Sequence, residues 1–383
     1  MLTNSDLMEL TELRRALHRR PEVSGQEQET AETVRRALNA LSPTQIITGL
    51  GGHGVAAVFD SGLDGPTVLF RAELDGLPIQ EISEKAWRSE IAGQGHLCGH
   101  DGHMTMLLAL GRLLRRKPVA KGRVVLLFQP AEEDGSGARA VVADPRFADI
   151  QPDWAFAIHN LPGIPLGQLA TRPGLMNCAS RGLRIHLTGK TAHAAMPEDG
   201  TSPMQAISEL IPALTALGQG GALDDSFQLV TLTHLSVGAP SFGISPGEAH
   251  LFATLRTAED TAMAGLADQA NTILEDAAKR HGLGLEVEVF DDFAASINDT
   301  EATEIALKAA GTLDIPSTNA GIPMRASEDF GVFGWSAKSA MLCLGAGETH
   351  AALHNPDYDF PDDLIPVGAA LFHQIARDLL GPT

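Results

Sequence analysis

The chain has 383 residues, 44% of them hydrophobic and 20% charged, and its formal net charge is −20. This length favours two domains over a single compact core, and the composition is that of a globular protein. The strong negative charge argues against nucleic acid as a partner, because an acidic surface repels the phosphate backbone.

The first half of the chain alternates between helical and extended patterns. Leucines at helical spacing predict a first helix that is capped by Asn4 or Ser5 and ends before Pro21. Further helices are predicted over residues 26–41, 104–116 and 138–144, and strands over residues 54–59, 67–74, 123–129 and 154–159. Continuous apolar strands separated by helices indicate a sheet buried on both faces, and therefore an α/β domain.

The pattern changes near Ala179. Alternating apolar and polar residues predict half-exposed strands over 181–189, 227–237, 248–256 and 285–290, with helices over 202–217 and 259–281. This β-α-β-β-α-β order indicates a ferredoxin-like unit. A helix over 300–311 and an apolar strand over 339–345 follow. We therefore predict a catalytic α/β domain of residues 1–179 and 292–383, with residues 180–291 inserted as a second domain.

The amino-terminal segment lacks the apolar region of a secretory signal, and the sequence contains no apolar run long enough to span a membrane. Three cysteines, Cys98, Cys178 and Cys343, are too few and odd in number for a disulfide framework. We therefore expect a cytoplasmic protein without a membrane partner.

Polar clusters follow four of the predicted strands: RAELDG, QPAEED, HN and GAGETHAALHNPDYDF. In open α/β sheets, sites form beyond the carboxyl ends of the strands, so these clusters are expected to meet in space. Residues 95–103, GHLCGHDGH, add Cys98, three histidines and Asp101. Thiolate, imidazole and carboxylate together suit zinc or a similar ion. The alternative is a polar loop that leads into the helix at Met104, with Asp101 as its cap.

Other candidate residues are ambiguous when each is taken alone. Adjacent acids such as Glu132 and Glu133 usually form a solvated surface, but these follow an apolar strand. A two-metal hydrolase needs one carboxylate as a ligand and another to take a proton from water. His159 and His354 are ordinary, partly buried histidines by themselves. In the inserted domain, His193 and Arg256 are also candidates. The alternative for both is a surface hydrogen bond or salt bridge without a role in function.

Taken together, these segments carry a resemblance to a known family. HRRPEVSGQE, RAELDGLPIQE, CGHDGHM, FQPAEE, HNLPG, GKTAHAAMPEDG, SEDF and LHNPDYDF occur in that order over nearly the whole length. The chain resembles the amidohydrolase branch of the aminoacylase-type metallopeptidases, which includes hippurate hydrolases, auxin-conjugate hydrolases and N-acetyl-amino-acid deacetylases. The resemblance implies a co-catalytic metallopeptidase-like α/β domain with an inserted ferredoxin-like lid and dimerisation domain.

The resemblance also implies roles for individual residues. Two divalent ions would be held by Cys98, His100, Glu133, His159 and His354. Their identity stays open among zinc, manganese, cobalt and nickel. Glu132 would be the general base, and Asp75 would orient a ligand. His193 would stabilise the oxyanion in the partner subunit's site of a homodimer, and Arg256 would bind the substrate carboxylate. The dimer contact is expected at edge strands such as residues 181–189 or 227–237.

The implied reaction is hydrolysis of a small N-acyl amino acid to a carboxylate and a free amino acid. Residues 95–97, 73–76 and 243–246 read GHL, ELDG and GISP, where the family often has Met-His-Ala, Asp-Met-Asp-Ala and Asn-Val-Ile-Pro. The missing Asn would face substrate, so the acyl group and the amino acid stay open. Three alternatives remain: a metal-dependent dipeptidase or carboxypeptidase, a hydrolase with Cys98 as nucleophile, and a catalytically silent binder.

Overall fold

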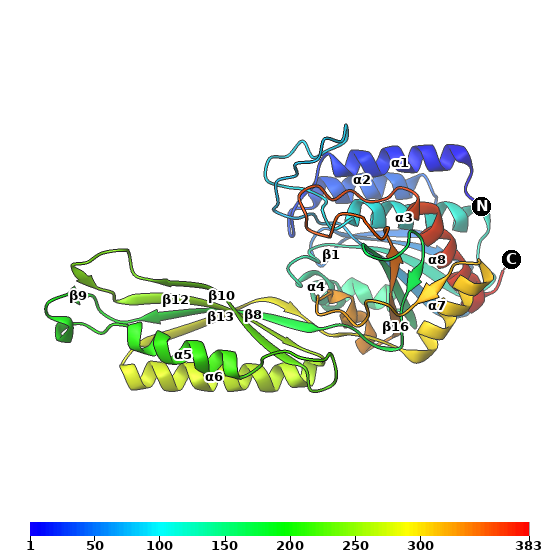
Figure 1. Cartoon of the computed structure of the whole chain (residues 1–383). Helices are drawn as coiled ribbons and strands as arrows, with labels where there is room; N and C mark the ends of the chain where they lie inside the picture. Colours follow the sequence, from blue (N-terminus) through cyan, green and yellow to red (C-terminus); the bar gives the residue numbers. More distant parts are fainter. Residues whose placement is uncertain (383) are drawn as a thin grey trace. The chain divides into compact units, whose positions relative to one another are not determined.

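The computed structural model describes residues 1–382, which divide into two compact units (Figure 1). Unit 1 holds Met1–Met176, Ser296–Ile322 and the chain from Glu328 onward, and unit 2 holds Asn177–Ala295 and Pro323–Ser327. No sequence pattern had indicated that Pro323–Ser327 returns to unit 2. None of the helices within residues 1–382 is both long enough and apolar enough to cross a membrane.

Unit 1 is built on an eight-stranded sheet with the order β1-β2-β4-β3-β5-β16-β6-β15. Its strands are β1 (Gln45–Leu50), β2 (Gly54–Asp60), β3 (Thr67–Glu73), β4 (Arg123–Gln129), β5 (Trp154–Leu161), β6 (Leu169–Ala170), β15 (Ser317–Thr318) and β16 (Lys338–Gly345). The four neighbours β4, β3, β5 and β16 run parallel, so their carboxyl ends share one edge. β1 and β2 are antiparallel, which makes the sheet mixed.

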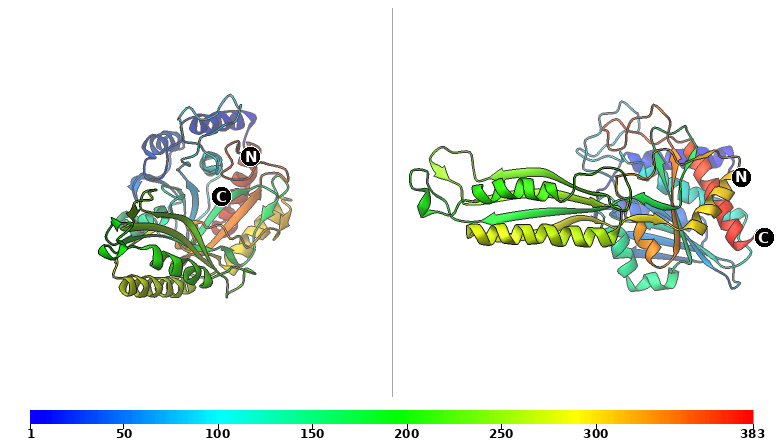
Figure 2. Two further views of the ribbon diagram at one scale, coloured as in Figure 1. Left: turned by 60° about the vertical axis from the view of Figure 1, so that its left-hand side comes forward. Right: turned by 60° about the horizontal axis from the view of Figure 1, so that its bottom comes forward.

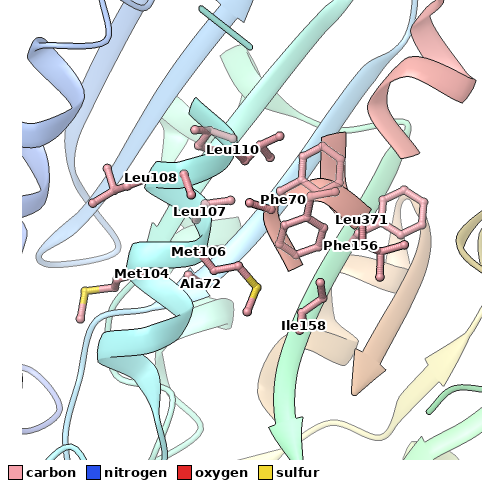
Figure 3. Close-up of a cluster of buried hydrophobic side chains, with 14 of the residues drawn as sticks. Phe70, Ala72, Met104, Met106, Leu107, Leu108, Leu110, Phe156, Ile158 and Leu371 are labelled. Carbon is pink, nitrogen blue, oxygen red and sulfur yellow. The ribbon is translucent and has the colours of Figure 1, made fainter. Parts of the chain in front are cut away.

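The helices of unit 1 pack against this sheet, as the two views of Figure 2 show. They are α1 (Asn4–His18), α2 (Gln28–Asn39), α3 (His100–Arg116), α4 (Gly137–Ala143), α7 (Thr300–Thr312) and α8 (Leu364–Leu380). Every residue of β3 is buried. In Figure 3, Leu107 of α3 lies beside Phe70 of β3, and the Phe70 ring is 5.9 Å from that of Phe156 in β5 and 4.7 Å from that of Phe372 in α8.

Three local predictions for unit 1 need correction. The cap of α1 is Thr3, whose side chain accepts a hydrogen bond from the Asp6 amide, and not Asn4 or Ser5. α3 begins at His100 rather than at Met104, so residues predicted as a loop form its first turn. The carboxyl-terminal helix α8 was not predicted, although its buried face is apolar apart from His373.

Unit 2 has a four-stranded antiparallel sheet with the order β10-β12-β8-β13. In chain order it comprises β8 (Ala179–Thr188), α5 (Met204–Ala216), β10 (Gln228–Val237), β12 (Glu248–Thr257), α6 (Asp260–His281) and β13 (Gly284–Phe293). α5 and α6 cover one face of the sheet (Figure 1). The short strands β9 (Ala192–His193) and β11 (Ile244–Ser245) pair within unit 2. In unit 1, β7 (Gly174–Asn177), which ends at the boundary with unit 2, pairs with β14 (Ser296–Asn298).

This strand order corrects one expectation about the edges of the sheet. Residues 181–189 were predicted as an edge strand, but β8 is paired on both sides, with β12 and with β13. The edges are β10, which the sequence had indicated, and β13. A partner chain that extends this sheet therefore has only β10 or β13 to pair with.

Candidate metal centre

The polar clusters meet at the carboxyl edge of the four parallel strands. Each comes from a segment at or beyond a strand end: Asp75 after β3, Glu132 and Glu133 after β4, His159 near the carboxyl end of β5 and His354 after β16. Cys98 and His100 flank Gly99, at the start of α3. Parallel strands with separate loops explain how residues far apart in sequence reach one place.

The turn at Gly99 positions two of these side chains. Gly99 has a φ of 92°, a left-handed conformation that favours glycine. A Cβ there would lie 2.4 Å from Nδ2 of Asn160, which donates a 2.7 Å hydrogen bond to the Cys98 carbonyl. His354 and Ala131 also have positive φ values, 65° and 49°. Such conformations are costly for residues other than glycine and cluster at functional sites.

The predicted ligands form two overlapping groups. The ligand atoms of Cys98, His100 and His159 lie within 4.8 Å of one another, and so do those of Cys98, Glu133 and His354. Cys98 Sγ is 3.3 Å from Nε2 of His159. Because Cys98 belongs to both groups, the five residues offer more ligands than one tetrahedral ion needs, and two ions can share the site.

Neighbouring groups orient the buried His100 and the half-buried His159. Nδ1 of His100 donates to the Asp75 carbonyl at 2.9 Å, and Nδ1 of His159 donates to the Asn160 carbonyl at 2.6 Å. Both rings are therefore left with Nε2 as the nitrogen that can bind a metal. The Asp75 carboxylate accepts hydrogen bonds from the Glu133 amide at 2.9 Å and from Ser24 Oγ at 2.8 Å, which fixes the loop after β4.

The chemistry of this donor set fits a divalent cation. Nε2 of His100 and Oε1 of Glu133 are buried without a hydrogen-bond partner within the described residues, 3.8 Å apart. Burial raises the pKa of Glu133 to about 7, although His100 opposes the shift. Burial, together with Glu133 and Glu132, also raises the pKa of the Cys98 thiol. A bound cation would stabilise the Glu133 carboxylate and the Cys98 thiolate, and it would give the unpaired atoms a partner.

A network of buried charges behind the ligands was not predicted. Arg71 in β3 donates to Glu328 at 2.8 Å and to Asp329 at 2.6 Å, and it also pairs with Glu73. Glu73 in turn lies 2.7 Å from Nδ1 of His103. An arginine inside the mostly apolar strand TVLFRAE was the available signal, because a buried charge must be paired.

Asp101 has another role than the cap that the alternative interpretation gave it. It lies in the first turn of α3 and is fully buried. Its Oδ2 accepts a hydrogen bond from Nη1 of Arg14 at 3.2 Å and lies 2.9 Å from Nδ1 of His18. Asp101 therefore joins α3 to α1 rather than capping a helix at Met104.

The two remaining predicted residues lie in unit 2, whereas all the others lie in unit 1. His193 in β9 is exposed, and its Nδ1 accepts a hydrogen bond from the Ala195 amide at 3.0 Å. Arg256 in β12 donates from Nη1 to the Arg325 carbonyl and to Ser327 Oγ, both at 2.8 Å. Within residues 1–382 it forms no ion pair with Glu259 or Asp260, the neighbours that a structural salt bridge would use.

Comparison with known proteins decides the family. Residues 69–378 match peptidase family M20/M25/M40. The chain belongs to this family. It is 28% identical to the N-acetylcysteine deacetylase of Bacillus subtilis, with 96% of each chain covered, and 28% identical to the hippurate hydrolase of Campylobacter jejuni, with 97% of each covered. The expected relationship to amidohydrolases is confirmed.

A solved structure supports the same assignment. The YXEP protein of Bacillus subtilis, described as a dinuclear metal binding peptidase from the M20 family, is 26% identical to the chain and superposes with a TM-score of 0.82 over 99% of both chains. This M20 family member is thus a metal-dependent amidohydrolase with a mixed α/β fold.

Proposed function

We propose that this M20 enzyme hydrolyses the amide bond of a small N-acyl amino acid, with two divalent ions held by Cys98, His100, Glu133, His159 and His354. The observation that carries the proposal is the pair of ligand groups that share Cys98, with Glu132 beside them. The names of the deacetylase and hippurate hydrolase relatives support the substrate class. When bound, such ions polarise the amide carbonyl and lower the pKa of a water molecule.

The surroundings of the two adjacent glutamates support different roles for them in this proposal. Glu133 lies between two histidines, 3.8 Å from Nε2 of His100 and 3.6 Å from Nε2 of His354, as a ligand would. Burial and the neighbouring Glu328 and Glu133 raise the pKa of Glu132 well above its ordinary value. A carboxylate with a raised pKa can take a proton from water and return it to the leaving amine. The products are a carboxylate and a free amino acid.

Unit 2 supplies the groups that recognise the substrate in this proposal. Arg256 is partly buried, and its hydrogen bonds within residues 1–382 go to two neutral acceptors, the Arg325 carbonyl and Ser327 Oγ. Burial lowers its pKa more than the neighbouring Asp291 raises it, so a substrate carboxylate would add counter-charge. His193 donates to the developing oxyanion in the active site of the partner subunit of a homodimer. The free edges of β10 and β13 are where that dimer would form.

The compartment in this proposal is the cytoplasm. Cys98, Cys178 and Cys343 are all buried free thiols. Reducing conditions preserve thiols in this state, and Cys98 would have to remain reduced to serve as a metal ligand.

A substrate screen tests the function. Chelator-treated enzyme is restored separately with zinc, manganese, cobalt or nickel and assayed on N-acetyl, N-benzoyl and indole-acyl amino acids and on matched dipeptides. We expect the enzyme to hydrolyse at least one acyl amino acid, and to do so at a higher rate than it hydrolyses any of the dipeptides. Preference for dipeptides would establish the peptidase alternative, and the absence of any turnover would favour a silent binder.

The alternative with Cys98 as nucleophile is tested in the same preparation. Burial and nearby acids raise the pKa of this thiol, the opposite of what an activated cysteine needs. We expect chelation to abolish activity and thiol alkylation of the metal-loaded enzyme to leave it unchanged. Inactivation by alkylation with all metal retained would establish the cysteine mechanism instead.

A further inference from the structure

Unit 2 carries a second group of metal-binding side chains, on the face of its sheet that α5 and α6 leave open. The ligand atoms of His186 in β8 and of Glu248 and His250 in β12 lie within 4.8 Å of one another. On both strands the neighbouring residues Ile185 and Leu251 are buried on the helix-covered face. Because side chains alternate along a strand, His186 and His250 point to the opposite face.

The strand register brings these groups together. His250 is directly opposite His186, and their rings stack with centroids 4.3 Å apart and planes 7° from parallel. Glu248 lies two residues before His250 and therefore on the same face. On the other side of His186, the register places Glu286 of β13 opposite it. Two imidazoles and two carboxylates thus gather on three adjacent strands.

The hydrogen bonding of His186 is incomplete. Its Nε2 is buried without a partner within the described residues. Its Nδ1 is 3.9 Å from the Glu286 carboxylate, too far for a hydrogen bond. Packing alone explains the stacked rings, but it leaves the unpaired nitrogen unexplained.

We propose that His186, His250 and Glu248 bind a divalent transition-metal ion of the zinc, nickel or copper class, with Glu286 available as a fourth ligand. Because the lone pair of each ring nitrogen lies in the ring plane, binding requires the stacked rings to rotate so that one nitrogen of each points to the ion. Imidazole and carboxylate are ligands that these ions accept, and a three- or four-ligand set matches zinc. The ion would connect β8 and β12, and also β13 when Glu286 takes part. A ligand that binds the folded state and not the unfolded chain stabilises the folded state, so the ion would raise the stability of unit 2.

Metal titration of the full-length chain tests this site. Chelator-treated wild type, His250→Asn, Glu248→Gln and the control His234→Asn are titrated with Zn²⁺, and bound ions per chain are counted after desalting. His234 is a matched control because it is an exposed histidine of the same sheet that packs on Phe252 and lies outside the ligand group. Circular dichroism confirms that each variant is folded.

We expect wild type and His234→Asn to bind one more ion per chain than His250→Asn and Glu248→Gln, at about 100 µM free Zn²⁺ or below. Zn²⁺ should raise the melting temperature of wild type and His234→Asn by more than that of the other two variants. Equal ion counts in all four would overturn the site, and so would a difference that appears only at roughly millimolar Zn²⁺. The result is independent of the catalytic ions, because only the difference between variants is measured.

Discussion

Adjacent residues of this chain face different surroundings at the end of β4. Oε2 of Glu132 is 3.9 Å from Nε2 of His100, and the nearest charges that act on it include Glu328 and Asp329. Glu133 instead reaches both His100 and His354. Ala131, with its left-handed φ of 49°, precedes them and turns the chain at this point. In the proposed function, these side-chain surroundings, and not the residue type, distinguish Glu132 as the base from Glu133 as a ligand.

The substitution Glu132→Gln keeps the size of the side chain and removes the basic oxygen. We expect turnover to fall by roughly 100-fold or more, with the metal content unchanged. The matched substitution Glu133→Gln should lower metal content instead. Steady-state kinetics and metal analysis of both variants provide the measurement, and the reverse pattern would mean that the two roles are exchanged.

Arg256→Ala tests how the substrate carboxylate is bound. We expect kcat/KM for acyl amino acids to fall roughly ten- to a hundredfold, because a charge-assisted hydrogen bond to the substrate is lost. The melting temperature should change little. The ratio of kcat/KM for the free acid to kcat/KM for the matching amide should also decrease. Arg184→Ala is the control, because Arg184 is a half-exposed arginine on the neighbouring strand β8 that pairs with Glu288. An unchanged acid-over-amide preference in Arg256→Ala would show that another group binds the carboxylate.

At the scale of elements, a buried ionic contact joins α1 to the helix that carries His100. Arg14 and His18 in α1 both contact Asp101 in the first turn of α3. His18 also lies 3.3 Å from the Glu81 carboxylate. All of these side chains are buried, so the loss of one partner would leave an uncompensated charge next to the turn that carries Cys98 and His100.

His18 should make this contact sensitive to pH. Burial opposes its protonation, but Asp101 and Glu81 outweigh it and raise the pKa of His18 to about 9. A raised pKa means that the stabilisation is fully present below the ordinary value near 6.5 and is lost as pH rises through 9. From this shift we expect wild type to lose up to about 3 kcal/mol of unfolding free energy relative to His18→Gln between pH 6.5 and 9.5. Urea unfolding of both proteins across this range is the measurement, and parallel curves would contradict the assignment.

At the scale of the whole molecule, the proposed site needs residues from two chains. The ligands and Glu132 belong to unit 1, and His193 belongs to unit 2. In a homodimer that exchanges His193, each active site would combine unit 1 of one subunit with unit 2 of the other. Oligomerisation would then be a condition for catalysis and not only for stability.

Mixing two inactive variants distinguishes action within a subunit from action between subunits. Glu132→Gln and His193→Ala are each expected to be nearly inactive. After unfolding and refolding as a mixture, half of the dimers are mixed, and each mixed dimer has one site with both residues intact if His193 acts across the interface. We expect about a quarter of wild-type activity to return. No recovery, with mixed dimers present on native gels, would place His193 in its own subunit's site, and a monomer at micromolar concentration would reject the dimer.

The sequence by itself determined the chemistry of the candidate site, because its ligand types lie in short motifs such as CGHDGH and FQPAEE. It also determined the alternation of strands and helices, because burial on one or both faces leaves a local periodicity in the chain. These features depend on residues that are close together along the chain.

Tertiary structure decided the features that depend on distant partners. α3 starts at His100 because the turn at Gly99 is held by Asn160, 61 residues further on. β8 lies in the middle of its sheet because β12 and β13, far along the chain, pair with its two sides. Arg71 finds its counter-charges in Glu328 and Asp329, more than 250 residues away. Local patterns cannot specify such pairings, since their energy comes from groups that only the folded chain brings together.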